Sequence, residues 1–106
     1  MADSYQIGQG DRAADGTVAL LRLSGELDIN AREDVHDAIL KNLDAGPTDI
    51  VVDLAAVTFI DSEALGALID GYNACQARDV GFRVTNARGL VDRVLTVSGA
   101  MELFGA

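Results

Sequence analysis

The sequence predicts a small α/β sandwich: one domain over residues 1–106 with a mixed, mostly parallel β-sheet and an antiparallel hairpin at its N-terminus. The length of 106 residues is typical of one domain. Hydrophobic residues make up 49% of the chain, which favours a packed core over disorder. Strand-like and helical runs alternate after the first hairpin, and this alternation indicates parallel strands joined by right-handed crossovers.

The N-terminal segments are expected to form the hairpin. Tyr5-Gln6-Ile7 alternates in polarity, and residues 17–23 (TVALLRL) are apolar nearly throughout, so both are strand candidates. Asp15-Gly16 between them is a turn signal. Gly8-Gln9-Gly10 is followed by Ala13 and leads into a strand, so we interpret it as a hairpin loop and not as a dinucleotide-binding fingerprint.

A loop and a first helix are expected next. Gly25-Glu26-Leu27-Asp28 is predicted to be the loop, and Asn30 the N-cap of the helix, with Glu33 placed as in a capping box. Gly46-Pro47 is predicted to end the helix, because glycine accepts the left-handed conformation and proline cannot continue the helix. Between these limits, apolar residues recur at helical spacing: Val35, Ala38, Ile39 and Leu43.

The remaining chain is predicted to alternate between strands and helices. Residues 49–54 (DIVVDL) lack polar alternation, which indicates a strand covered on both faces, and residues 81–85 (GFRVT) are the next strand. A helix is predicted after Asp61, and a last full helix before Ser98-Gly99, with one more turn over 101–104. The helical positions are Ala64, Leu65, Leu68, Ile69, Tyr72 and Cys75, then Leu90, Val91, Val94 and Leu95. We interpret Cys75 as a core residue.

The charge of the chain narrows the class of its partners. Lys and Arg number 8 against 17 Asp and Glu, giving a formal net charge of −9. Such a chain repels phosphate backbones and anionic lipids, so neither nucleic acid nor a membrane is the expected partner. The first four residues are polar, no apolar run approaches the roughly 20 residues of a membrane span, and a single cysteine excludes an internal disulfide. We expect a cytoplasmic protein.

Two predicted loops should lie at the same end of the sheet. Sites in such sheets gather beyond the carboxyl ends of the strands, and residues 25–30 and 59–63 both belong there. The second loop contains Asp61-Ser62-Glu63, a hydroxyl between two carboxylates.

Two interpretations of these three residues stay open from the residues alone. In the first, Asp61 caps the helix and Glu63 lies in its first turn, where the helix dipole favours negative charge. In the second, Ser62 is a phosphorylation site, because a hydroxyl in an exposed first turn can reach a kinase. A phosphate would add about −1.5 to −2 charges there.

A hydrolase is not expected at Ser62. The G-x-S-x-G elbow is missing, since the flanking positions hold Ile60 and Ala64. The one histidine, His36, precedes the serine and lies on the polar side of the first helix, so it is interpreted as a surface residue and not as a catalytic base.

A magnesium site built from Asp28, Asp53 and Asp61 is conceivable but disfavoured. Carboxylates at strand ends hold this ion in phosphotransfer receiver domains. A lysine near the end of the last strand is expected there, whereas Lys41 is the only lysine and lies on the first helix. Capping and turn roles are the favoured interpretation of the three acids.

The stretch 53–69 (DLAAVTFIDSEALGALI) resembles the signature of STAS domains, the anti-sigma factor antagonist family. That signature reads Asp-Leu-Ser-x-Val-x-Phe-Ile-Asp-Ser-Ser-Gly-Leu-x-x-Leu. Residues 23–28 (LSGELD) are similar to the motif at the end of the family's first strand. Residues 91–104 (VDRVLTVSGAMELF) are similar to its last helix and tail. The resemblance covers nearly the whole chain in the right order.

The resemblance implies a regulatory binding protein. Such antagonists bind an anti-sigma factor that is also a serine kinase, and binding frees the sigma factor. The kinase uses ATP to phosphorylate the serine after the motif's aspartate, the antagonist then dissociates, and a serine phosphatase restores it. By position, Ser62 is the phosphoacceptor. The partner-binding residues implied are Asp28, Asn30, Asp61, Glu63 and Ala64.

The same resemblance implies no catalytic residue, cofactor or metal in this chain, and we expect a monomer because no long exposed apolar stripe is evident. Two positions depart from the family pattern: Glu63 replaces its second serine and Ala64 its glycine. A fixed charge beside the acceptor could partly mimic the phosphorylated state. Some STAS proteins are not phosphorylated, so the alternative is a structural STAS subunit of a transport or signalling complex.

Overall fold

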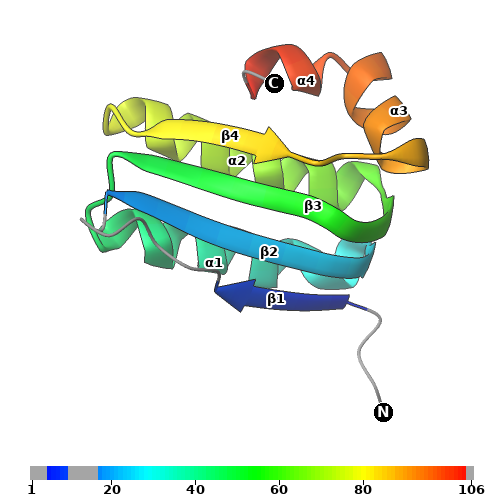
Figure 1. Cartoon of the computed structure of the whole chain (residues 1–106), viewed down its shortest axis with the longest axis horizontal. Helices are drawn as coiled ribbons and strands as arrows, with labels where there is room; N and C mark the ends of the chain where they lie inside the picture. Colours follow the sequence, from blue (N-terminus) through cyan, green and yellow to red (C-terminus); the bar gives the residue numbers. More distant parts are fainter. Residues whose placement is uncertain (1–4, 10–16, 105–106) are drawn as a thin grey trace.

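The computed structural model describes residues 5–9 and 17–104, and its sheet is the predicted mixed sheet (Figure 1). The strand order is β1-β2-β3-β4. Strand β1 (Tyr5–Gln9) runs antiparallel to β2 (Val18–Leu27), whereas β3 (Asp49–Ile60) and β4 (Gly81–Thr85) continue in parallel. Gly8 and Gln9 belong to β1, so assigning them to a hairpin loop was wrong. Gly10 and the predicted turn at 15–16 lie outside the described residues.

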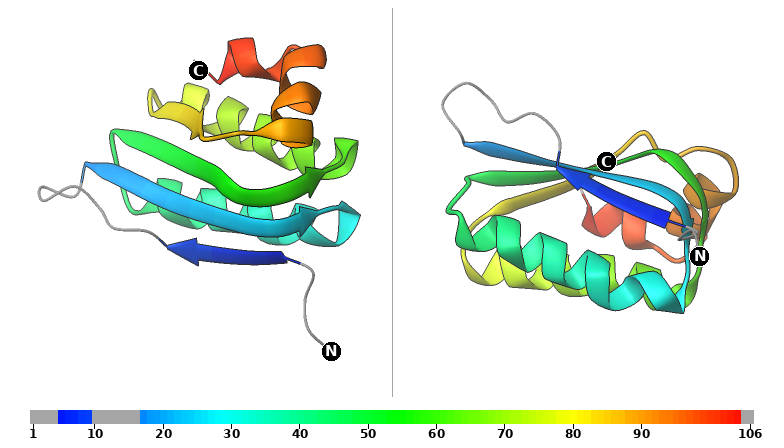
Figure 2. Two further views of the ribbon diagram at one scale, coloured as in Figure 1. Left: turned by 45° about the vertical axis from the view of Figure 1, so that its right-hand side comes forward. Right: turned by 90° about the horizontal axis from the view of Figure 1, so that it is seen from below.

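Four helices complete the described structure: α1 (Ile29–Asp44), α2 (Ser62–Ala77), α3 (Gly89–Val97) and α4 (Ala100–Leu103). Helices α1 and α2 lie side by side against one face of the sheet, and α3 and α4 lie beyond its β4 edge (Figures 1 and 2). No described helix covers the opposite face of the sheet (Figure 2). The α/β class and the order of elements are confirmed.

Strand β3 shows that only one sheet face is fully covered. Ile50, Val52 and Leu54 are buried beneath the helices, whereas Val51 is only half-buried on the other face. The predicted coverage of both faces was therefore wrong. Val51 pairs with the half-buried Leu20 on β2 and the exposed Arg83 on β4, and such partial cover allows an apolar residue on an open face. The missing polar alternation misled the prediction for this reason.

The start of α1 also differs from the prediction. The helix begins at Ile29, and Asp28 is its N-cap: the Asp28 carboxylate accepts a hydrogen bond of 2.9 Å from the N–H of Asn30. Asn30 is therefore a helical residue. Residues 25–27 form the end of β2 and not a loop, and Gly25 has a φ of 84° that few other residues adopt. The end of α1 is as predicted, with Gly46 at a φ of 82° just beyond it.

An aromatic cluster attaches the C-terminal helices to the rest of the fold. The ring of Phe104 lies 5.4 Å from Phe82 of β4 and 6.2 Å from Tyr72 of α2, measured between ring centroids. Phe104 is fully buried and directly follows α4. The extra turn predicted at the C-terminus is therefore confirmed, and it closes the core at the β4 edge. Cys75 is buried in the same core, and burial raises the pKa of its thiol.

Candidate functional site

The end of β3 is brought beside the end of β2 by two register shifts. Arg22 pairs with Asp53, and Leu27 pairs with Ile60, so β3 uses two more residues than β2 over the same distance. The shifts fall between Arg22 and Ser24 and between Gly25 and Glu26 on the β2 side. Extra residues bend a strand and increase its twist. They therefore decide where the chain following β3 points.

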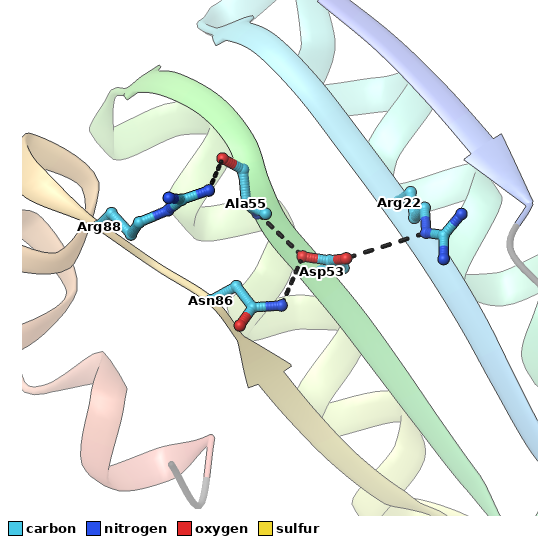
Figure 3. Close-up of polar contacts among 5 residues, drawn as sticks. All are labelled: Arg22, Asp53, Ala55, Asn86 and Arg88. Atoms are coloured by element: carbon cyan, nitrogen blue, oxygen red, sulfur yellow. Dashed lines mark hydrogen bonds and ion pairs between the residues drawn. The ribbon is translucent and has the colours of Figure 1, made fainter.

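The carboxylate of Asp53 secures the first shift (Figure 3). One oxygen accepts hydrogen bonds from the N–H of Ala55 at 2.9 Å and from Nδ2 of Asn86 at 3.1 Å. The other oxygen lies 3.9 Å from Nε of Arg22, and Arg88 donates a hydrogen bond to the Ala55 carbonyl at 3.1 Å. These contacts join β2, β3 and the segment after β4.

The same contacts favour the ionised form of Asp53. The hydrogen bond from Ala55 is the largest cause that lowers the pKa of this carboxyl below its ordinary value, and partial burial opposes it. The Asn86 hydrogen bond and the charges of Arg22 and Arg88 lower it further. From the sequence we had considered Asp53 only as a metal ligand. The roles of Asn86 and Arg88 were not predicted. An asparagine directly after a strand was the available signal, and Asn86 does adopt a positive φ of 62°.

Asp53 lies far from Asp28 and Asp61, the other two acids of the disfavoured magnesium site. It lies seven residues before Ile60, about 20 Å back along the strand. Within the described ranges, no group of three His, Cys, Asp or Glu side chains could hold a metal ion. The acids act as a bulge anchor and two helix caps.

Asp28 and Asp61 do come together, as neighbouring N-caps. The N–H of Asp61 donates a hydrogen bond of 3.0 Å to the carbonyl of Leu27, which joins the ends of β2 and β3. The Asp61 carboxylate accepts from the N–H of Ala64 at 2.9 Å, just as Asp28 accepts from Asn30. The predicted placement of the two connections at the same edge of the sheet is confirmed, although each connection between strand and helix is a single residue and not a loop. The N-termini of α1 and α2 therefore lie side by side at the same edge of the sheet.

Ser62 is the first residue of α2, and it is exposed. Its hydroxyl forms no hydrogen bond with any residue that the structure describes, and the adjacent Asp61 carboxylate accepts from the N–H of Ala64. The first backbone N–H groups of a helix have no partner within the helix and form a site favourable to anions. The position therefore combines an accessible hydroxyl with a backbone that tolerates a phosphate.

Glu63, the second residue of α2, is paired across the two helices. Its Oε2 lies 3.0 Å from Nη1 of Arg32 on α1, and both side chains are about half exposed, at 45% and 51%. The sequence analysis described Glu63 as a fixed charge beside Ser62 and did not predict a partner for it. Arg32 counters that charge, and this contact between helices could not be predicted from spacing.

Two exposed apolar side chains lie at the same edge. Ile29 follows the cap Asp28 and is 60% exposed, and Phe59 precedes Ile60 at the end of β3 and is 39% exposed. The sequence did not single them out. By contrast, Ala64 is fully buried, so its methyl group belongs to the core and cannot contact a partner. The exposed surface of this edge, which we call the cap edge, comprises Asp28, Ile29, Asn30, Phe59, Asp61, Ser62 and Glu63.

His36 lies elsewhere, in a shallow groove between α1 and α2. The groove is lined by Arg32, Glu33, Ala67 and Asp70 as well as His36. Nδ1 of His36 lies 3.8 Å from the Asp37 carboxylate, and Ser62 is not among the lining residues. His36 is therefore placed beside Asp37 and not at Ser62.

Within residues 5–9 and 17–104, no helix is both long enough and apolar enough to cross a membrane.

The chain matches the family model described as "Mlab, STAS domain" over residues 11–105. A STAS-domain containing protein of Pseudomonas aeruginosa is 29% identical over 92 residues, which cover 87% of this chain and 90% of that protein. An anti-sigma-B factor antagonist of Staphylococcus epidermidis is 23% identical over 83 residues, covering 78% and 77% of the two chains.

Solved structures agree with this assignment. An anti-sigma factor antagonist from Mycobacterium paratuberculosis superposes with a TM-score of 0.82 at 28% identity, covering 95% of this chain and 83% of that one. The unphosphorylated anti-sigma factor antagonist SpoIIAA shares the fold, with a TM-score of 0.72 at 24% identity and coverages of 93% and 84%. The chain belongs to the STAS domain family.

Proposed function

We propose that this STAS domain is an anti-sigma factor antagonist whose binding is ended by phosphorylation of Ser62. It binds an anti-sigma factor that carries serine kinase activity, and binding frees a sigma factor. The observation that supports this most is the position of Ser62: an exposed, unbonded hydroxyl where two strand ends and two helix starts meet. The likeness to the Mycobacterium antagonist points in the same direction.

The cap edge has the composition of a docking surface. Ile29 and Phe59 offer apolar area, and Asp28, Asp61 and Glu63 surround it with carboxylates. Protein interfaces commonly combine a buried apolar centre with a polar rim. The complementary partner surface is one with an apolar patch and basic residues around it.

Phosphorylation would change this surface without unfolding it. The γ-phosphoryl group of ATP moves to Oγ of Ser62, ADP leaves, and the hydroxyl proton passes to the kinase. The added charge of about −1.5 to −2 is compatible with the α2 N-terminus. A partner whose basic residues face the carboxylates, and whose surface opposite Oγ of Ser62 is apolar, must desolvate the phosphate to stay bound, so it dissociates. A serine phosphatase that hydrolyses the ester restores the docking surface.

The experiment compares immobilised wild-type chain, Ser62→Asp and Ser62→Ala as baits for extracts of the host cell. We expect wild type and Ser62→Ala to retain an ATP-binding anti-sigma factor and Ser62→Asp to lose it. The captured kinase with ATP should add one phosphate to wild type, detected by mass spectrometry, and none to Ser62→Ala. Equal capture by all three baits would contradict the switch.

Asn73→Asp is the matched control for added charge. Asn73 is exposed on the same helix, roughly three turns from Ser62. This variant should capture the kinase as well as wild type does. If it too loses the partner, the effect of Ser62→Asp comes from net charge and not from the site.

A second candidate is a structural STAS subunit without a switch. It is favoured by Glu63 at the position of the family's second serine. It predicts that wild type and Ser62→Asp capture the same partner and that this partner is not a kinase.

A further inference from the structure

We propose that Arg32 is the residue of this chain that binds the phosphate on Ser62, and that Glu63 occupies it until phosphorylation. The inference rests on the proposed phosphorylation of Ser62 and deepens it. Glu63 then has a defined part in the switch: it keeps the guanidinium beside the acceptor while the serine is unmodified.

The geometry places Arg32 within reach of the new group. Its Nη1 lies 3.0 Å from Oε2 of Glu63, the residue next to Ser62. Consecutive Cα atoms are about 3.8 Å apart, although consecutive side chains of a helix point in different directions, so Arg32 has to change its side-chain conformation to reach a phosphate on Ser62. Arg32 is about half exposed and free to move between the two acceptors.

Arg32 is also the one Lys or Arg that the described parts of α1 and α2 carry near the cap edge. Helix α2 carries no Lys or Arg. Helix α1 carries one other, Lys41, in its last turn, and its histidine, His36, lies a turn beyond Arg32 and beside the Asp37 carboxylate. Arg78 lies just beyond the opposite end of α2, where it pairs with Asp44 at 2.8 Å. No other described Lys or Arg lies on the N-terminal half of either helix.

Charge and shape favour exchange of the partner. A phosphate dianion carries more charge than a carboxylate and offers three acceptor oxygens that match the planar guanidinium. The pair that must open is an exposed ion pair, which holds its partners only weakly. Moving Arg32 to the phosphate leaves Glu63 without its counter-charge. One phosphorylation therefore adds charge at Ser62 and leaves the charge of Glu63 no longer neutralised.

The pairing explains how Glu63 is compatible with a switch. In the unmodified chain Arg32 counters the Glu63 charge, so Glu63 does not imitate phosphoserine. After phosphorylation the same carboxylate is released and adds to the negative surface. The departure from the family pattern at this position therefore strengthens the difference between the two states.

The test uses the full chain with phosphoserine incorporated at position 62 during translation, which requires no kinase. The second pKa of the phosphate is followed by ³¹P NMR during a pH titration. A nearby cation favours the dianion, so Arg32→Gln should raise this pKa by about half a unit. Arg32→Lys, which keeps the charge and loses the fork, should give an intermediate value. Glu63→Gln should lower the pKa, because it removes a negative neighbour and a competitor.

Arg78→Gln is the matched control, because it removes an ion pair between α1 and the chain after α2 at the far end of the helices. It should leave the phosphate pKa unchanged. Equal pKa values in wild type and Arg32→Gln would overturn the inference, even if a kinase phosphorylates Ser62 and then dissociates. A shift in Arg32→Gln with no kinase ever captured would instead support Arg32 and contradict the proposed function.

Discussion

At the scale of single residues, Asp53 shows how one carboxylate can decide the course of a strand. It satisfies the N–H of Ala55 at a register shift and ties that point to Asn86 and Arg22 (Figure 3). Removing the Asp53 carboxylate leaves the N–H of Ala55 and the side-chain amide of Asn86 without their acceptor. We expect Asp53→Ala to lower the free energy of unfolding by about 1–3 kcal/mol, measured by urea denaturation.

Asp70→Ala is the control for this loss. Asp70 is exposed on α2 and forms no ion pair with any described residue, so its removal should change stability by no more than about 0.5 kcal/mol. Equal losses in the two variants would contradict the anchoring role of Asp53.

The effect of Asp53 should also depend on pH, with a defined sign. The contacts hold its folded-state pKa below the ordinary value of 3.8, so the folded protein binds the proton less readily than the unfolded chain. The stabilisation is therefore complete above about pH 5 and is lost as the pH falls through the folded pKa. The difference between wild type and Asp53→Ala, measured by denaturation at each pH, should shrink on that side only.

At the scale of elements, the sequence predicted which elements exist better than where they begin. Asp28 and Asn30 are both good N-caps, and the choice of Asp28 follows from where β2 ends against β3, a contact that local spacing does not contain. Gly25 looked like a loop residue, yet it serves a register shift inside β2. Long-range pairing decided both cases.

The contact between α1 and α2 depends on a glycine. A Cβ added at Gly71 would lie 2.7 Å from Cδ1 and 2.9 Å from Cγ2 of Ile39, closer than real contacts allow. We expect Gly71→Ala to destabilise the fold by about 1–3 kcal/mol in thermal or urea unfolding, although alanine has the higher helix propensity.

Gly66 lies on the same helix, but a side chain added there would meet no neighbouring atom. Nothing lies within 4 Å of a Cβ built there, so Gly66→Ala should stabilise the protein by up to about 1 kcal/mol. If both alanine variants were stabilising, the close approach of α1 and α2 would not be the constraint that the geometry indicates.

At the scale of the whole molecule, periodicity and alternation were sufficient for the fold class, the parallel crossovers and the meeting of Asp28, Asp61 and Ser62 at one edge. Parallel strands must end at the same side of a sheet, so this part of the site follows from topology alone. The exposure of Ile29 and Phe59 and the Arg32–Glu63 pair depend on how helices pack. No periodicity encodes those contacts, so Ile29, Phe59 and Arg32 were missed, and Glu63 was named without its partner.

The net charge supplies a prediction for the whole molecule. Asp and Glu outnumber Lys and Arg by 17 to 8, and every ion pair among the described residues has at least one well-exposed partner. Repulsion among the acids should therefore outweigh the gain from the pairs, and salt screens both. Raising the salt from about 20 mM to about 300 mM shortens the screening length severalfold, so the melting temperature at neutral pH should rise by several degrees.

Sodium chloride and potassium chloride should act alike if screening is the cause. A fall in melting temperature would mean that the surface pairs contribute more than the acidic excess costs, and the Arg32–Glu63 pair would then be harder to open than its exposure implies.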